Sequence, residues 1–191
     1  LRSFESTRIP ATGLSAETWT AFVPESVFRE VRPLVRGDSW RSGEAETSVR
    51  WPPKSFRLKD LNMVSLVLRV RWRDREGWLM GDALGIQERD LMDLGDPGPG
   101  PGHRVLKVGH HGSRSASDPG WVEALRPERA VIAASRRNAF GFPHRSTLET
   151  LAAAGCGSVW TTGQSGGVRF EAVPAGWSVS SGADDWIAQL F

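Results

Sequence analysis

The order of its apolar segments is the feature that most constrains this chain, because strand-like and helix-like patterns alternate. Residues 64–73 alternate apolar and polar side chains, as a half-buried strand does. Further strands are expected at 78–80, 105–108 and 130–134. Helices are expected between and after these strands, at residues 86–94, from Asp118 with Pro119 in its first turn, and at 146–154 with a Ser146–Glu149 capping box. Such alternation predicts a layered α/β (α+β) domain.

The ends of the chain are less regular than its middle. A short helix is expected near residues 28–35, and a hairpin is expected to pair 159–162 with 167–171. The Pro/Gly segment 95–102 is expected to be a surface loop. We therefore predict one partial domain over residues 1–175 and a C-terminal tail over 176–191, with a short helix from Asp184 to Phe191.

Composition excludes several classes of protein. No apolar run approaches the roughly 18–20 residues that a membrane helix needs. The single Cys156 excludes an internal disulfide framework, and its Ala-Gly-Cys-Gly setting favours a structural role. Arginine dominates the 24 basic residues, which suits phosphate contacts and equally fits a GC-rich genome.

Polar side chains follow each of the central predicted strands. Asp82 ends the 78–80 strand, His110 and His111 follow the next strand, and His144 lies in the loop after the third, at the start of a helix. In α/β sheets the carboxyl ends of strands are where sites are built. His and carboxylate are ligands of hydrolytic Zn²⁺ or Mn²⁺ centres, where bound water has its pKa lowered to about 7.

Each of these residues also has a purely structural interpretation. Asp82 could cap the following helix, and His144 could be a neighbour of a helix N-cap. Two adjacent imidazoles beside a glycine turn are harder to explain as packing, because buried polar rings need partners. Taken together at strand ends, the four residues favour a metal-dependent hydrolytic site.

The same loops carry groups suited to phosphate. Ser113 lacks the Gly-x-Ser-x-Gly context of a nucleophile, and Gly112 lets the backbone approach a ligand closely. Arginines could clamp a phosphodiester, although they could equally form a solvated basic surface; they are Arg114, Arg136, Arg137 and Arg145.

These segments together resemble the metallo-β-lactamase-fold domain at the C-terminus of the ComEC family, the inner-membrane DNA channels of natural competence. The most specific match is Leu106-Lys-Val-Gly-His-His-Gly-Ser-Arg114, preceded by Gly81-Asp82. Weaker matches, in order across residues 15–172, are Asn62 through Ser65-Leu-Val-Leu-Arg69, Asn138-Ala-Phe-Gly-Phe-Pro-His144, and Trp160-Thr161 through Gly166-Gly-Val168.

The resemblance implies the C-terminal portion of a four-layer αββα sandwich and a metal-dependent phosphodiesterase that acts on DNA during transformation. It implies that Asp82 bridges metals, and that His144 and one of His110 and His111 lie on the metal or the scissile phosphate. Which histidine of the adjacent pair is the ligand stays open. The substrate-binding residues would be Ser113, Arg114, Asn138 and Arg145.

Two departures from the family pattern bear on activity. The His-x-Asp-x-Asp-His motif that supplies most metal ligands is absent, since no histidine precedes His103. Because the chain begins at Leu1 just after the expected motif, we interpret it as a piece of a longer polypeptide that is inactive alone. Phe142 also replaces the first histidine of the family's His-Pro-His loop.

Three functions remain open at this stage. The first is part of a DNA phosphodiesterase with a Zn²⁺ or Mn²⁺ cofactor. The second is a non-catalytic module that guides DNA by its arginine-rich loops, and the third is another hydrolase of this fold acting on a small ester or lactam. The resemblance places the domain on the extracytoplasmic face of the bacterial inner membrane, with DNA and the remainder of a parent membrane channel as its partners.

Overall fold

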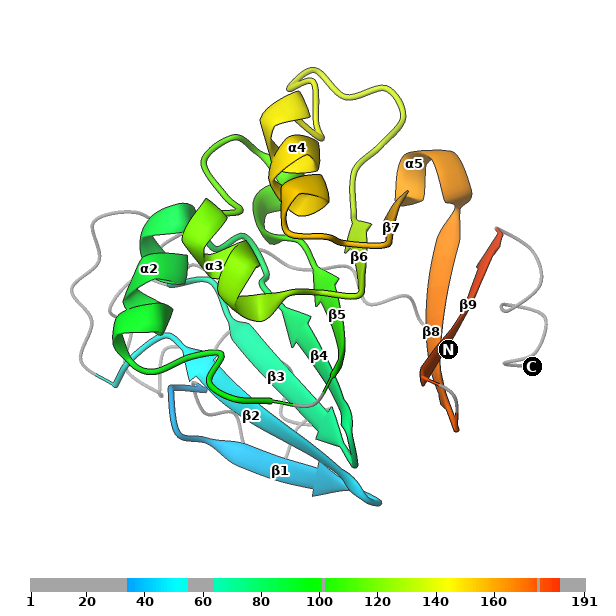
Figure 1. Ribbon diagram of the computed structural model, residues 1–191. Coiled ribbons are helices and arrows are strands. Elements are labelled where there is room, and N and C mark those ends of the chain that lie inside the picture. The colour runs from blue at the N-terminus through cyan, green and yellow to red at the C-terminus, as the bar shows by residue number, and fades with distance from the viewer. Residues whose placement is uncertain (1–33, 55–63, 101, 175, 183–191) are drawn as a thin grey trace, which may run out of the picture.

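A seven-stranded mixed sheet forms the centre of the protein (Figure 1). The computed structural model describes residues 34–54, 64–100, 102–174 and 176–182. Strands follow chain order across the sheet; the first four pair antiparallel and β4 to β7 pair parallel. They are β1 (Ser39–Ser42), β2 (Ala45–Trp51), β3 (Val67–Trp72), β4 (Arg75–Leu79), β5 (His103–Lys107), β6 (Arg129–Ile132) and β7 (Ser158–Thr161).

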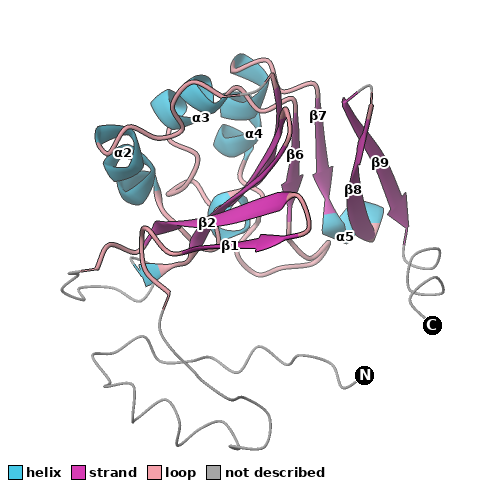
Figure 2. Cartoon of the chain, turned by 90° about the horizontal axis from the view of Figure 1, so that it is seen from below, coloured by secondary structure: helices cyan, strands magenta, loops and turns pink. Residues whose placement is uncertain are grey.

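Helices connect the parallel strands and lie on one face of the sheet (Figures 1 and 2). Parallel strands that follow one another in order, joined by crossovers of one hand, place all their helices on the same face. The connections contain α2 (Gly85–Asp93), the 3-10 turn η2 (Gly109–Gly112), α3 (Pro119–Leu125) and α4 (Arg145–Ala153), and a short α5 (Thr162–Ser165) follows β7. None of the helices in the described residues has the length and apolar character needed to cross a membrane.

The hydrophobic core lies between these helices and the sheet. Trp78 of β4 and Trp121 of α3 are fully buried and pack edge to face, with ring centroids 5.1 Å apart. Leu106 and Ile132 extend this core along the next two strands, and Leu151 of α4 covers it. This core therefore holds β4, β5 and β6 in fixed relative positions, and with them the loops at their carboxyl ends.

A second sheet, the hairpin β8 (Gly167–Val173) and β9 (Gly176–Gly182), lies next to β7 (Figures 1 and 2). The buried Arg75 guanidinium donates to the carbonyl oxygens of Val173 and Gly176, and so attaches the hairpin to β4. Trp160 of β7 packs edge to face on Phe170 of β8, with ring centroids 5.8 Å apart. These contacts lie on the face of the main sheet opposite to the helices.

Most predicted elements are confirmed, and the mixed α/β class is confirmed with them. The predicted pairing of 159–162 with 167–171 is wrong, because β7 joins β6 in parallel and β8 pairs with β9. Residues 176–182, the first part of the predicted C-terminal tail, form β9. The Ser146–Glu149 capping box is also wrong: His144 is the N-cap of α4, and Glu149 pairs with Arg145. The expected helices near 28–35 and 184–191 lie outside the described residues.

Candidate functional site

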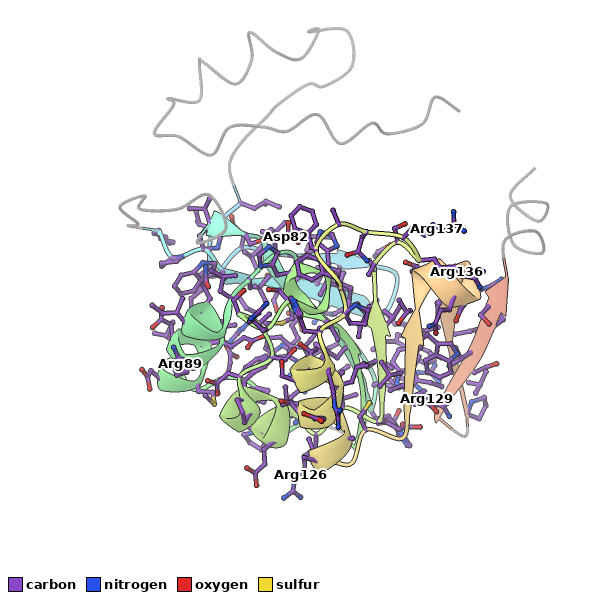
Figure 3. The ribbon with its side chains drawn as sticks, turned by 90° about the horizontal axis from the view of Figure 1, so that it is seen from above. Asp82, Arg89, Arg126, Arg129, Arg136 and Arg137 are labelled. Carbon is purple, nitrogen blue, oxygen red and sulfur yellow. The ribbon has the colours of Figure 1, made fainter. Side chains whose placement is uncertain are left out.

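The predicted site residues gather at one edge of the sheet, as their positions after parallel strands require. Asp82 follows β4, His110 and His111 form the η2 turn after β5, and His144 ends the loop that follows β6. Figure 3 shows Asp82 on this side of the molecule and Arg126, at the end of α3, on the opposite side. The prediction that these residues share a sheet edge is confirmed.

The Gly-His-His-Gly sequence builds an unusual turn. His110 and His111 both have positive φ, 43° and 56°, a region that costs a residue with a Cβ roughly 1 kcal/mol or more. A Cβ at Gly109 would lie 2.6 Å from the carbonyl oxygen of Ala83, and one at Gly112 would lie 2.7 Å from Pro143. The two glycines therefore let the strand end approach both neighbouring loops, while the two imidazoles project from a strained turn.

Asp82 and His111 face each other across this edge. The Asp82 Oδ1 to His111 Nε2 distance is 3.5 Å, and both side chains are a little under half exposed, 43% and 45%. The other ring nitrogen, Nδ1, lies 2.6 Å from the carbonyl oxygen of Ala133, which can only accept. His111 Nδ1 therefore carries the proton. In the neutral ring Nε2 then has a free lone pair, which points toward the Asp82 carboxylate.

Backbone contacts hold Asp82 in place. Its N–H donates to Ser65 Oγ at 2.6 Å, while the carbonyl of the preceding Gly81 accepts from Lys107 Nζ at 2.6 Å and from the His110 N–H at 3.1 Å. Burial lowers the pKa of Lys107, and the nearby Asp82 carboxylate raises it. Helix α2 begins at Gly85 with Leu84 as its N-cap, so the alternative that Asp82 caps this helix is wrong.

His144 and His110 have different partners from His111. His144 Nδ1 accepts a hydrogen bond from the Arg114 N–H at 3.0 Å, and its own N–H donates to Gly112 O. The His110 ring nitrogen Nδ1 lies 3.4 Å from Ser115 Oγ. Across residues 34–54, 64–100, 102–174 and 176–182, no three His, Cys, Asp or Glu side chains lie close enough to hold a metal ion. The structure thus brings Asp82 and His111 together and keeps the other two imidazoles apart from them.

Phe142 lies next to all three histidines of the site. Its ring centroid lies 5.9 Å from His110, 6.2 Å from His111 and 5.2 Å from His144. It stacks nearly parallel on the His111 ring and meets the His144 ring edge on. An apolar ring that can supply neither a metal ligand nor a proton is therefore within contact distance of all three imidazoles.

The predicted substrate-binding residues separate into buried and exposed groups. Asn138 is a loop clamp: its side chain donates to Ser135 O and Phe142 O and accepts from the Phe142 N–H, each at 2.8 Å. Ser113 is buried and its hydroxyl pairs with Ser115 at 2.9 Å. Arg114 is exposed, as is Arg145, which forms an ion pair with Glu149.

Sequence reasoning missed three groups that shape this site. Lys107 and Ser65 hold the turn before Asp82, and the Ala133 carbonyl sets the tautomer of His111. Lys107 carried a signal, since a lysine between the apolar Leu106 and Val108 of a buried strand must find a polar partner. No side-chain pattern could have revealed the role of a backbone carbonyl.

Two curated proteins are similar in sequence to part of the chain. It is 34% identical over 93 residues to ComE operon protein 3 of Bacillus subtilis, which covers 47% of the chain and 11% of that protein. It is 43% identical over 47 residues to Recombination protein 2 of Haemophilus influenzae, covering 25% of the chain and 6% of that protein. No protein-family model matches. The chain therefore spans a small part of these relatives, which support the resemblance to the ComEC competence family.

Proposed function

We propose that this chain is part of a metal-dependent phosphodiesterase that acts on DNA in a ComEC-like uptake system. The single observation that carries this proposal is the Asp82–His111 pair, in which His111 Nε2 faces a carboxylate oxygen while Nδ1–H is held by a backbone carbonyl. A histidine ligand of a metal almost always donates its other N–H in this way, which fixes the ring orientation.

The donor atoms of this pair are compatible with one shared ion. Two ligands with bonds of about 2.0–2.2 Å at a tetrahedral ion lie about 3.4 Å apart. The Asp82 Oδ1 to His111 Nε2 distance of 3.5 Å is close to that separation and too long for a good hydrogen bond. His110 has the Ser115 hydroxyl and not a carbonyl beside its Nδ1, and no carboxylate of the described residues forms an ion pair with it, so we assign His111 as the ligand of the adjacent pair.

Asp82 and His111 would supply two ligands to Zn²⁺ or Mn²⁺, and such an ion would polarise a phosphoryl oxygen and activate water. Two ligands are too few for a hydrolytic centre, which needs at least three from the protein. We propose that the others come from a His-x-Asp-x-Asp-His motif outside these 191 residues, which do not contain one. His110 and His144 then lie at the rim, where they can orient and protonate phosphate oxygens.

The face of the main sheet opposite to the helices supports the four-layer αββα fold. The strand register places Leu68, Leu79 and Val131 on the face opposite to the helices. Leu79 is 42% exposed, and the β8–β9 hairpin contacts this face near Arg75 and Trp160. A second sheet packed here would bury these apolar side chains and complete the two central layers.

Three parts of the proposal rest on the family resemblance and on the two partial relatives. They are DNA as the substrate, a membrane channel as the partner and the extracytoplasmic face as the location. Exposed arginines beside the site are compatible with a phosphodiester substrate.

A specific observation favours one alternative, a non-catalytic module that guides DNA. Phe142 lies beside all three imidazoles, and an apolar ring supplies neither a ligand nor a proton. This alternative predicts DNA binding that falls steeply with salt, without metal-dependent cleavage.

The proposal is tested by measuring DNA cleavage by the full-length polypeptide that contains this sequence. With Mn²⁺ or Zn²⁺ present, Asp82→Asn and His111→Gln are expected to abolish cleavage. His103→Gln is the matched control, because His103 pairs with Glu128 away from Asp82. Cleavage that survives in both site variants would overturn the assignment, and bound DNA without any cleavage would favour the guiding module.

A further inference from the structure

Phe140 is the most exposed of the large hydrophobic side chains in the described residues, with 72% of its surface accessible. It lies in the loop between β6 and α4, two residues before Phe142. A phenyl ring this open to water contributes little to the core. Its position beside the candidate site suggests that it is kept exposed for contact with a ligand.

The Phe140 ring is held in a defined orientation. It stacks on Phe142 with ring centroids 5.4 Å apart and planes 17° from parallel, and Phe142 in turn stacks on His111. The Asn138 clamp closes the loop on both sides of Phe140 by bonding Ser135 and Phe142. One face of Phe140 is therefore occupied by Phe142, and the other is presented to solvent as the end of a short aromatic stack.

Positively charged side chains lie in the same loop as Phe140 and in a neighbouring loop. Arg136 and Arg137 are exposed in the same loop, and Arg114 is exposed in the neighbouring loop that His144 contacts. Figure 3 shows Arg136 and Arg137 toward the same side of the molecule as Asp82. No acidic side chain of the described ranges forms an ion pair with any of these three guanidiniums. Their charge is thus available to an anionic ligand.

We infer that Phe140 is a stacking platform for a base of single-stranded nucleic acid, with Arg136 and Arg137 contacting the adjacent phosphates. An aromatic face combined with a basic track is how proteins bind single strands without reading sequence, because every base has a π-face. The inference rests on the proposed function for DNA as the ligand, but it needs no metal. It specifies that the strand reaching this edge is unpaired, since a base inside a duplex cannot stack on Phe140.

Fluorescence anisotropy with the 191-residue chain and labelled oligonucleotides, in EDTA and low salt, tests this inference. The probes are oligo-dT, an abasic oligomer of equal length and a duplex. Phe140→Ala is expected to weaken oligo-dT binding by about 5- to 100-fold per stacked base and to leave binding of the abasic strand unchanged. Phe140→Trp is expected to retain oligo-dT binding. Leu148→Ala, which removes an exposed apolar side chain from α4, is the matched control.

The outcomes separate this inference from the proposed function. Equal affinity for oligo-dT and the abasic strand would overturn stacking, as would preference for the duplex or an unaffected Phe140→Ala variant. Loss of oligo-dT binding in Phe140→Ala, together with absence of cleavage by the full-length polypeptide, would retain the platform and reject the hydrolase. Arg136→Gln with Arg137→Gln is expected to weaken both single strands alike and to reduce the salt dependence.

Discussion

Glu88 gives a stability prediction whose size follows from the structure. Its side chain is 1% exposed on α2, and its two oxygens accept from the N–H groups of Ser117 and Asp118 at 3.1 and 2.6 Å. Burial raises the pKa of Glu88 from 4.5 to about 7, although the two backbone donors lower it. Between these values the unfolded chain has lost the proton and the folded chain keeps it. Stability therefore falls as pH rises through this window, by about 1.4 kcal/mol per pH unit and about 3 kcal/mol in total.

Urea unfolding followed by tryptophan fluorescence from pH 4.5 to 8 measures this effect. Glu88→Gln is neutral throughout, so the free energy of unfolding of the wild type minus that of the variant should fall by about 3 kcal/mol across the window. Glu123→Gln, on the exposed side of α3, should show no such trend. A wild-type minus Glu88→Gln difference that is constant or rises with pH would refute the reasoning.

Three further changes have defined outcomes. Phe142→His places a fourth imidazole beside the other three and should raise Zn²⁺ affinity roughly tenfold or more in calorimetry, where each 1.4 kcal/mol is tenfold; unchanged affinity would contradict the ring placement. Asn138→Ala removes three hydrogen bonds and should cost about 1–3 kcal/mol in urea unfolding, so a cost within error would argue against the clamp. Arg75→Met leaves two hairpin carbonyls unpaired and should speed amide exchange in β8–β9 but not in β5.

Local patterns were enough to predict the central strands and helices, because each is bounded by strong turn signals. The Pro-Gly start of α3 is an example: Asp118 accepts from the N–H groups of Gly120 and Trp121, as an N-cap does. Long-range pairing was not predictable in the same way. Strand β7 has the composition of a hairpin arm, yet it joins β6 because the α4 crossover delivers it there in parallel.

The position of the site was predictable from strand ends, but its internal geometry was not. Sequence could place His110 and His111 together at one edge, whereas choosing between them required the Ala133 carbonyl and the Asp82 carboxylate. The family resemblance implies that Asn138 is a substrate contact. In the structure its side chain forms hydrogen bonds with the backbone of its own loop. Only the folded conformation of that loop reveals these bonds.

The central claim, that Asp82 and His111 are metal ligands, can be tested by NMR of the imidazole side chains. The chain has four histidines, so four ring signals can be assigned by single His→Gln variants. Titration with Zn²⁺, or with Mn²⁺ as a paramagnetic probe, should perturb the His111 signal first, and Asp82→Asn should remove that response. The His103 signal should stay unchanged. A first response at His110 or His103, or a His111 response that persists in Asp82→Asn, would contradict the claim.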